Sequence, residues 1–300
     1  MTVIGIDQVE FVVRDAAEAE RYLLAWGLVK VDSAAGTLFT CVDGSGVSFV
    51  EEAAAAGQQR PYPTIREVTW GVSDQAALDA LGADLAHDRA VTEAGGTLRT
   101  SDDSGLAIAL RVTRKQPIEG TPPLVNAPGA AARIDASATF YDKAIPHEIS
   151  HLVLGVEDLA TNEAFYRHRL GFHVSDRYID RGVFLRAPQV GHHHNLFLLD
   201  DGKFTFNHLA FKVRDIHEVI GGGQGFARWG AETLVGPGRH FASSGCFWYF
   251  KSPFGGALEY VADEDVVTPA WEPSELTPSP ERFSEWVFHS GSELGTLKGH

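Results

Sequence analysis

The sequence predicts an α+β protein of two domains, each made of two βαβββ modules. Three observations lead to this fold class: a segment pattern that recurs four times, a Pro-rich stretch near the middle, and a length of 300 residues. That length corresponds to two domains at roughly 100–200 residues each. Hydrophobic residues make up 44% and charged residues 22% of the chain, which is ordinary for a globular protein and excludes disorder throughout.

Each of the four recurring segments is an apolar stretch that ends on an aspartate. The segments are 8–15, 67–74, 151–158 and 208–215. Their β-branched and aromatic content predicts strands. The aspartate is a good helix N-cap, because its carboxylate accepts from free N–H groups of the following turn. After Asp158, apolar residues from Leu159 to Leu170 have near-helical spacing, and Gly171 is expected to end that helix.

Alternating apolar stretches after the predicted helices indicate further strands, which complete the βαβββ unit. Examples are 37–42, 47–51, 182–186, 195–199 and 247–251. The glycine cluster 221–225 is expected to end the helix that follows Asp215. It lacks the strand-to-helix context of a dinucleotide-binding loop.

Composition shifts predict the domain organisation. The first domain is expected over 1–115, a Pro-rich linker over 116–139, and the second domain over 140–265. The remaining tail, 266–300, carries four prolines and is expected to wrap irregularly over the second domain.

Charge and cysteine content exclude several classes of partner. The net charge of −15 repels phosphate backbones and anionic lipids, so neither nucleic acid nor a membrane surface is an expected partner. No apolar run reaches the roughly 18 residues of a membrane span. Cys41 and Cys246 are too few for a disulfide framework. Residues 1–7 lack the basic and apolar regions of a signal peptide, so we expect a cytoplasmic protein.

The histidines point to chemistry in the second half of the chain. Of 13 histidines, only His87 precedes residue 147. His151 and His208 open equivalent strands of two repeats, and Glu259 lies within a later apolar strand, where a carboxylate is costly unless it is paired or binds a metal. Together they form a candidate two-His, one-carboxylate triad, which suits non-heme Fe(II) acting with O2; zinc or manganese would also accept these ligands.

Further motifs make a family resemblance specific. They are the helix end 164–172, the segment Gly236-Pro237-Gly238-Arg239-His240, Tyr249 nine residues later, and Ser252-Pro253 with Gly255 before Glu259. On these residues, the chain from about 1 to 265 resembles the vicinal oxygen chelate superfamily, and within it the two-domain type I extradiol catechol dioxygenases.

The resemblance implies a fold, a metal and a reaction. Each domain would be a curved mixed sheet, an incomplete barrel, with helices outside. Fe(II), or Mn(II) in its place, would be held by His151, His208 and Glu259. The substrates would be a catechol-type aromatic diol and O2, and the protein would be a homo-oligomer of an aromatic catabolic pathway.

The resemblance also implies three catalytic side chains. An acid/base histidine should precede an apolar strand, and the run 192–194 fits that place. His194 is our choice because it directly precedes the polar residue and the strand, with His193 as the alternative. His240 and Tyr249 match the residues that hydrogen-bond the bound catechol and oxygen. No residue is assigned to an organic cofactor.

The first domain and residue 235 depart from the ligand patterns of the family. Gln8 and Glu67 occupy the repeat positions of the two histidines, and the strand 106–110 carries no carboxylate, so the first domain is expected to be a non-catalytic scaffold. Family members that act on acid-bearing catechols can carry an Arg where this chain has Val235. This predicts a neutral or apolar ring substituent.

Two other functions remain as alternatives. One is a glyoxalase-like metal-dependent lyase or isomerase, which generally uses more Glu or Gln ligands. The other is a non-enzymatic, ligand-sequestering protein, which needs an apolar cleft and no metal. The set of His151, His208 and Glu259, with His240 and Tyr249, favours the dioxygenase over both.

Overall fold

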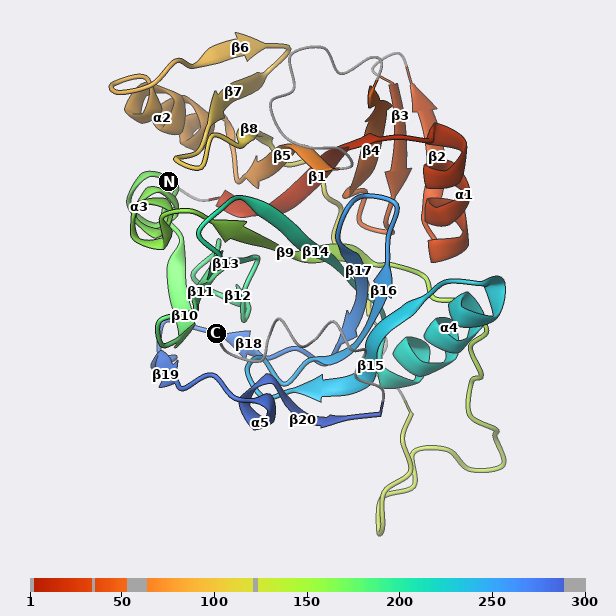
Figure 1. Cartoon of the computed structure of the whole chain (residues 1–300). Helices are drawn as coiled ribbons and strands as arrows, with labels where there is room; N and C mark the ends of the chain where they lie inside the picture. Colours follow the sequence, from red (N-terminus) through yellow and green to blue (C-terminus); the bar gives the residue numbers. More distant parts are fainter. Residues whose placement is uncertain (1–2, 34–35, 53–63, 121–123, 289–300) are drawn as a thin grey trace.

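A computed structural model describes residues 3–33, 36–52, 64–120 and 124–288. Two large mixed sheets dominate it, with few helices (Figure 1). Both sheets are curved, and neither closes into a barrel within the described residues. The predicted α+β class, with curved mixed sheets and helices outside, is therefore confirmed.

The first sheet has eight strands in the order β2-β3-β4-β1-β5-β8-β7-β6. Its central strand β1 pairs in parallel with β4 and antiparallel with β5. The elements are β1 (Val3–Val13), α1 (Ala16–Trp26), β2 (Val29–Ser33), β3 (Gly36–Thr40), β4 (Gly46–Glu51), β5 (Thr64–Val72), α2 (Gln75–Leu85), β6 (Thr92–Ala94), β7 (Thr97–Ser101) and β8 (Ala107–Val112).

The second sheet has ten strands in the order β19-β10-β11-β13-β9-β14-β17-β16-β15-β20. A two-stranded sheet, β12-β18, lies beside it. The elements are β9 (Glu148–Val156), α3 (Leu159–Ala164), η2 (Phe165–Arg169), β10 (His173–Tyr178), β11 (Gly182–Arg186), β12 (Gly191–His192), β13 (Leu196–Asp200), β14 (Thr205–Lys212), α4 (Ile216–Trp229), β15 (Thr233–His240), β16 (Cys246–Lys251), β17 (Ala257–Ala262), β18 (Val266–Val267), β19 (Ser274–Leu276), α5 (Pro280–Phe283) and β20 (Ser284–Val287).

The four repeated aspartates cap four helices, as predicted. Each accepts a hydrogen bond from a backbone N–H in the first turn of α1, α2, α3 or α4, and the four residues are Asp15, Asp74, Asp158 and Asp215. The helix after Asp158 differs in its second half. It changes at Phe165 from α-helix to a π-helical turn that buries Phe165 and Tyr166.

The predicted end of the fourth helix at residues 221–225 is wrong, because α4 continues to Trp229. The glycines serve close packing instead. A Cβ on Gly225 would lie 1.7 Å from the Asp142 carbonyl oxygen, and one on Gly223 would lie 2.3 Å from the Trp248 ring. Because these positions of α4 are glycines, the chain before β9 and strand β16 can approach the helix backbone.

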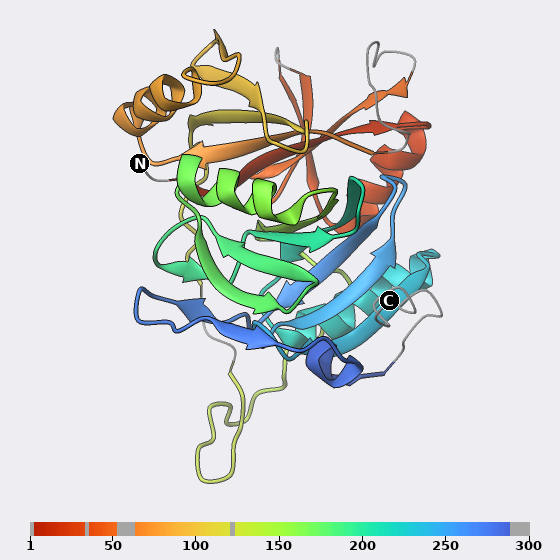
Figure 2. The same cartoon turned by 60° about the vertical axis from the view of Figure 1, so that its left-hand side comes forward.

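The tail after residue 265 is more regular than expected. Strand β19 pairs in parallel with β10, and β20 pairs antiparallel with β15, so the tail extends both edges of the second sheet (Figure 2). Residues 289–300 lie outside the described part of the chain. The tail therefore contributes strands to the second sheet.

The two sheets share one hydrophobic core. Helix α1 of the first half packs on the second sheet, where the Trp26 and Tyr260 rings stack with centroids 3.7 Å apart. The Tyr260 hydroxyl donates to the Trp26 carbonyl over 2.7 Å. This packing covers one face of the second sheet. The opposite face carries the candidate site. Among the described residues, no helix is long and apolar enough to cross a membrane.

Candidate metal centre and its pocket

The register of the second sheet brings the candidate residues into one row. His151 on β9 is opposite Ala210 on β14, Ala210 is opposite Glu259 on β17, and Glu259 is opposite Tyr249 on β16. Residues directly opposite one another in neighbouring strands point to the same face. His208 lies two residues before Ala210 and therefore points to the same face. The two histidines from equivalent positions of the repeats thus lie on one face of the sheet.

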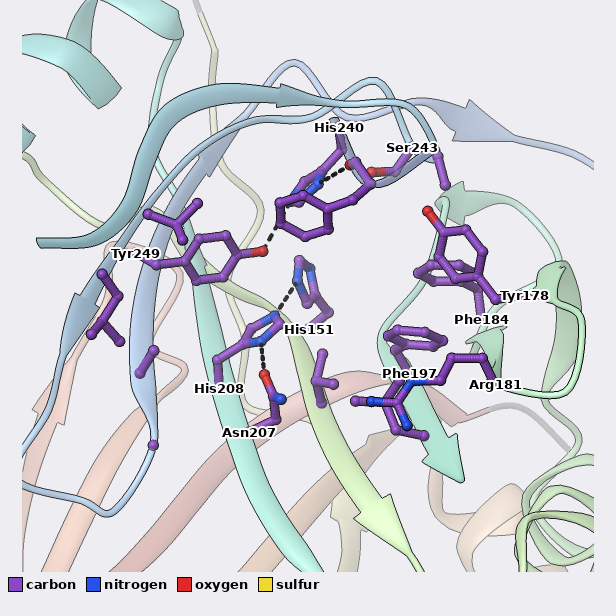
Figure 3. A pocket seen from close by; sticks show the side chains of 18 of the residues that line it. His151, Tyr178, Arg181, Phe184, Phe197, Asn207, His208, His240, Ser243 and Tyr249 are labelled. Carbon is purple, nitrogen blue, oxygen red and sulfur yellow. Dashed lines mark hydrogen bonds between the residues drawn. The ribbon is translucent and has the colours of Figure 1, made fainter. Parts of the chain in front are cut away.

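Three potential ligand atoms converge at the centre of this row. His151 Nε2 lies 3.3 Å from His208 Nε2 (Figure 3). Glu259 Oε2 lies 3.1 Å from His151 Nε2 and 3.3 Å from His208 Nε2. Ligands about 2.0–2.2 Å from an ion and at right angles would be about 3 Å apart. The three atoms thus have the spacing of a facial ligand triad.

Glu259 is a buried carboxylate whose surroundings favour a cation. Its side chain is fully buried, and Oε1 has no hydrogen-bond partner. Burial by itself raises the pKa of Glu259, but the close contacts with the His151, His208 and His240 rings outweigh it and hold the pKa well below the usual value. A buried, ionised and partly unsatisfied carboxylate is costly without a compensating charge, which a divalent ion would supply.

The tautomer of His208 suits metal binding. Its Nδ1 lies 2.7 Å from Asn207 Oδ1, which can only accept, so Nδ1 carries the proton (Figure 3). The Nε2 lone pair is then free to face the other two ligand atoms. Metal-binding histidines are generally oriented in this way by a partner on the other ring nitrogen.

His194 and His193 form a hydrogen-bonded pair anchored by a carboxylate. His193 Nε2 lies 2.9 Å from Asp176 Oδ2, and His193 Nδ1 lies 3.2 Å from His194 Nδ1. Because the carboxylate only accepts, His193 donates through Nε2 and accepts at Nδ1 from His194. His194 is left with an unprotonated Nε2, and its ring centroid lies 4.1 Å from that of His151. Burial lowers the pKa of His194, and neighbouring His151 and His193 lower it further.

His240 and Tyr249 form a second pair beside the triad. His240 Nδ1 lies 3.1 Å from the Phe283 carbonyl oxygen and therefore donates to it. The Tyr249 hydroxyl then donates to His240 Nε2 over 2.9 Å (Figure 3). His240 Nε2 is also 3.5 Å from Glu259 Oε1, so the pair lies directly beside the carboxylate.

These groups face a cavity of about 780 Å³. One wall is aromatic: the Phe184 and Phe197 rings stack with centroids 3.9 Å apart, next to Tyr178. Two cations line the cavity, and both are ion-paired. Arg181 Nη1 lies 3.0 Å from Asp201 Oδ1, and Lys251 Nζ lies 3.2 Å from Glu232 Oε2.

The structure brings together all six residues singled out from the sequence. His151, His208, His194, His240 and Tyr249 line the cavity, and Glu259 lies beneath it against the histidines. His193, the alternative to His194, is fully buried behind it. Sequence reasoning missed Asp176, Asn207 and Glu264. Only Asn207, which directly precedes His208, offered a signal in the sequence.

The first half of the chain engages its equivalent positions differently. Gln8 Nε2 donates to Ser48 Oγ over 2.9 Å, and Glu67 pairs with Arg99 at 3.1 Å. Among the described residues, the two clusters with metal-ligand geometry both lie in the second half and share His151: one with His208 and Glu259, the other with His194 and Glu264.

Comparison with known proteins shows which proteins this chain resembles. Residues 148–260, which contain the triad, match the Glyoxalase/Bleomycin resistance protein/Dioxygenase superfamily. That stretch of the chain is therefore similar to the superfamily.

More particularly, the similar proteins include a metapyrocatechase, a glyoxalase and a 2,3-dioxygenase. "Metapyrocatechase 2" of Cupriavidus necator is 27% identical over 264 residues, 88% of this chain and 82% of that protein. A Mn(II)-bound glyoxalase from Novosphingobium aromaticivorans has a similar structure with a TM-score of 0.77 and 24% identity, covering 97% and 93% of the chains. The 2,3-dioxygenase LapB from Pseudomonas sp. KL28 has a TM-score of 0.71 and 23% identity, covering 92% and 98%. The chain thus has the two-domain fold of the extradiol catechol dioxygenases.

Proposed function

We propose that this protein is an extradiol dioxygenase, which opens a catechol-type ring beside its two adjacent hydroxyls and inserts both atoms of O2. The observation that carries the proposal is the cluster of His151 Nε2, His208 Nε2 and Glu259 Oε2, mutually 3.1–3.3 Å apart beneath a cavity. The relationship to a metapyrocatechase over most of both chains supports the reaction class.

The proposed metal is Fe(II), held by His151, His208 and Glu259, with Mn(II) as the alternative. Two neutral imidazoles and one carboxylate suit either ion and leave coordination positions open. When bound, such an ion would stabilise a catecholate anion and mediate electron transfer to O2.

Three side chains would handle protons and charge in the reaction. His194 lines the cavity, and its Nε2, left without a proton, would accept one from a catechol hydroxyl. The Tyr249 hydroxyl and the His240 ring hold each other beside the triad, where they would orient the substrate and stabilise developing negative charge on oxygen.

The preferred substrate would carry a neutral, apolar ring substituent. Pockets of about 300–1,000 Å³ enclose drug-sized ligands, so this cavity has room for more than one ring. Phe184 and Phe197 offer an apolar stacking surface, whereas Arg181 and Lys251 are already paired with carboxylates. Val235, directly opposite Tyr249, adds no charge.

The glyoxalase-like alternative shares the fold, and the two chemistries differ in their need for O2. The test uses Fe(II)-loaded protein with catechol, alkylcatechols, an aryl-substituted catechol and a carboxylate-bearing catechol. We expect a coloured ring-opened product in air and none under argon, with the highest kcat/KM for the alkyl or aryl compounds. Product formed equally without O2 would favour a lyase. Binding of these compounds without turnover would favour ligand sequestration.

The resemblance also leads us to propose a homo-oligomer, and the two free cysteines lead us to propose a reducing cytoplasm. Light scattering on the purified full chain would measure the oligomeric state. Localisation of the tagged protein in the producing cell would test the compartment.

A further inference from the structure

We propose that Glu264 is a positioning residue for His151. It would hold the His151 ring in place and keep the proton on Nδ1, so that Nε2 faces the metal. This inference rests on the metal centre of the proposed function. It goes beyond the triad because Glu264 would not itself bind the ion.

Carboxylates flank both edges of the His151 ring. Glu259 Oε2 lies 3.1 Å from Nε2, and Glu264 Oε1 lies 3.3 Å from Nδ1. Ser150 Oγ lies 3.2 Å from Nδ1 and donates its own proton to Glu264 Oε2, so both groups that face Nδ1 can only accept, and Nδ1 carries the proton. Ligating histidines usually donate their other N–H to such a partner, which orients the ring and raises its basicity. His208 uses Asn207 for this purpose, and His151 would use Glu264.

Glu264 is itself held rigidly inside the protein. Its side chain is fully buried, Ser150 Oγ donates to Oε2 over 2.6 Å, and Lys212 Nζ lies 3.5 Å from the same oxygen. A buried carboxylate without compensation would be costly, and Lys212 supplies the opposite charge. The side chain is therefore fixed and oriented before any metal binds.

The polar contacts that hold Glu264 continue through Lys212 to the first half of the chain. Lys212 Nζ donates to His192 Nδ1 over 2.7 Å, and His192 Nε2 lies 2.8 Å from Glu148 Oε1. Glu148 Oε2 lies 3.3 Å from Lys115 Nζ, which is also 3.0 Å from Asp43 Oδ2. A continuous chain of polar groups thus joins a metal ligand to the first domain, and gives that domain a role in supporting the site.

A second metal between His151, His194 and Glu264 is the competing interpretation, since their ligand atoms also lie within 4.8 Å of one another. With one ion already on Nε2, a second on Nδ1 would require His151 to lose both ring protons. A positioning hydrogen bond needs only the neutral ring, which favours our assignment.

The experiment measures Mn(II) binding to the full chain after removal of metals with a chelator. Isothermal titration calorimetry gives the Kd and stoichiometry, and circular dichroism confirms that each apo variant is folded. We expect Glu264→Ala to raise the Kd about 10- to 100-fold, the usual effect of losing such a partner. Glu264→Gln keeps a carbonyl acceptor and should raise the Kd less. Where the Ala variant does not fold, the Gln variant carries the test, with a rise of at least about 3-fold expected.

Glu218→Gln is the matched control. Glu218 is also a buried carboxylate, but it accepts from the backbone N–H groups of Ile145 and Arg214 and does not line the cavity. Its substitution should leave the Mn(II) Kd unchanged. Wild-type Kd in the folded Glu264 variants would overturn the positioning role, as would two Mn(II) ions per wild-type chain. A wild-type protein that binds no Mn(II) or Fe(II) would instead contradict the metal centre and the proposed function.

Discussion

His193 Nδ1 lies 3.2 Å from His194 Nδ1, and this contact determines which nitrogen of His194 can act as a base. Asp176 sets the positions of the protons on both rings, because it accepts a hydrogen bond from His193 Nε2 over 2.9 Å. His194 Nε2 is thereby left unprotonated toward the cavity. The two histidines that the sequence offered as alternatives are thus hydrogen-bonded partners, and in the proposed reaction His194 would act as the base while His193 orients it.

Asp176→Asn tests this arrangement. The amide can donate to His193 Nε2, which would reverse both tautomers and place a proton on His194 Nε2. We expect kcat to fall at least about 10-fold, approaching the loss of about 10²–10⁴ expected for His194→Gln. Combining the two substitutions should add little further loss, because they act on one unit. Steady-state kinetics at equal metal content checks this, and independent, multiplicative losses would contradict it.

Glu259→Gln should abolish tight metal binding while the protein stays folded. The carboxylate provides the negative charge of the triad, and its loss leaves two neutral imidazoles. Metal analysis after gel filtration would measure occupancy. Tyr249→Phe is the control: it removes the hydroxyl bonded to His240 but no proposed ligand, so it should keep the metal and lose turnover. Equal metal content in the wild type and Glu259→Gln would refute the assignment.

Phe197→Leu should reduce the preference for aryl substituents. Phe197 stacks on Phe184 in the cavity wall, and it is the better target because Phe184 also packs against the His194 ring. Loss of aromatic packing worth about 1 kcal/mol should lower kcat/KM for an aryl-substituted catechol about 5-fold relative to catechol itself. Competition between the two substrates measures this ratio. An unchanged ratio would show that the substituent does not contact this wall.

Glu148→Gln should destabilise the protein in a pH-dependent way. Burial by itself raises the pKa of Glu148, but its contacts with His192, Lys115 and Lys212 outweigh this and lower the pKa to about 2. Because the folded pKa lies below the unfolded one, this stabilisation is complete above about pH 4.5 and is lost as the pH falls toward 2. At pH 7 the free energy of unfolding should fall by about 3 kcal/mol at most. Urea unfolding at pH 7 and 3.5 checks this, and an equal loss at both would argue against the ionised pair.

The sequence predicted the parts that depend on local pattern and repetition. The aspartate caps, the strands with His151 and His208, and the position of Glu259 all follow from periodicity and from repeat equivalence. Glu264 could not be found in this way, because it lies in the acidic run 263–265, which looks solvent-exposed. Its burial depends on Ser150 and Lys212, which are distant in sequence. The glycines of α4 led to a wrong helix end for a similar reason. Their role, the close approach of residues distant in sequence, is visible only in the packed structure.

Oxygen uptake distinguishes a dioxygenase from a lyase in one experiment. Anaerobically Fe(II)-loaded protein is mixed with an alkyl- or aryl-substituted catechol, and O2 consumption is followed with an electrode while catechol loss is followed by chromatography. We expect one O2 to be consumed per catechol, with both atoms of ¹⁸O2 found in a ring-opened product. No O2 consumption by protein that demonstrably holds iron, across the catechol panel, would contradict it.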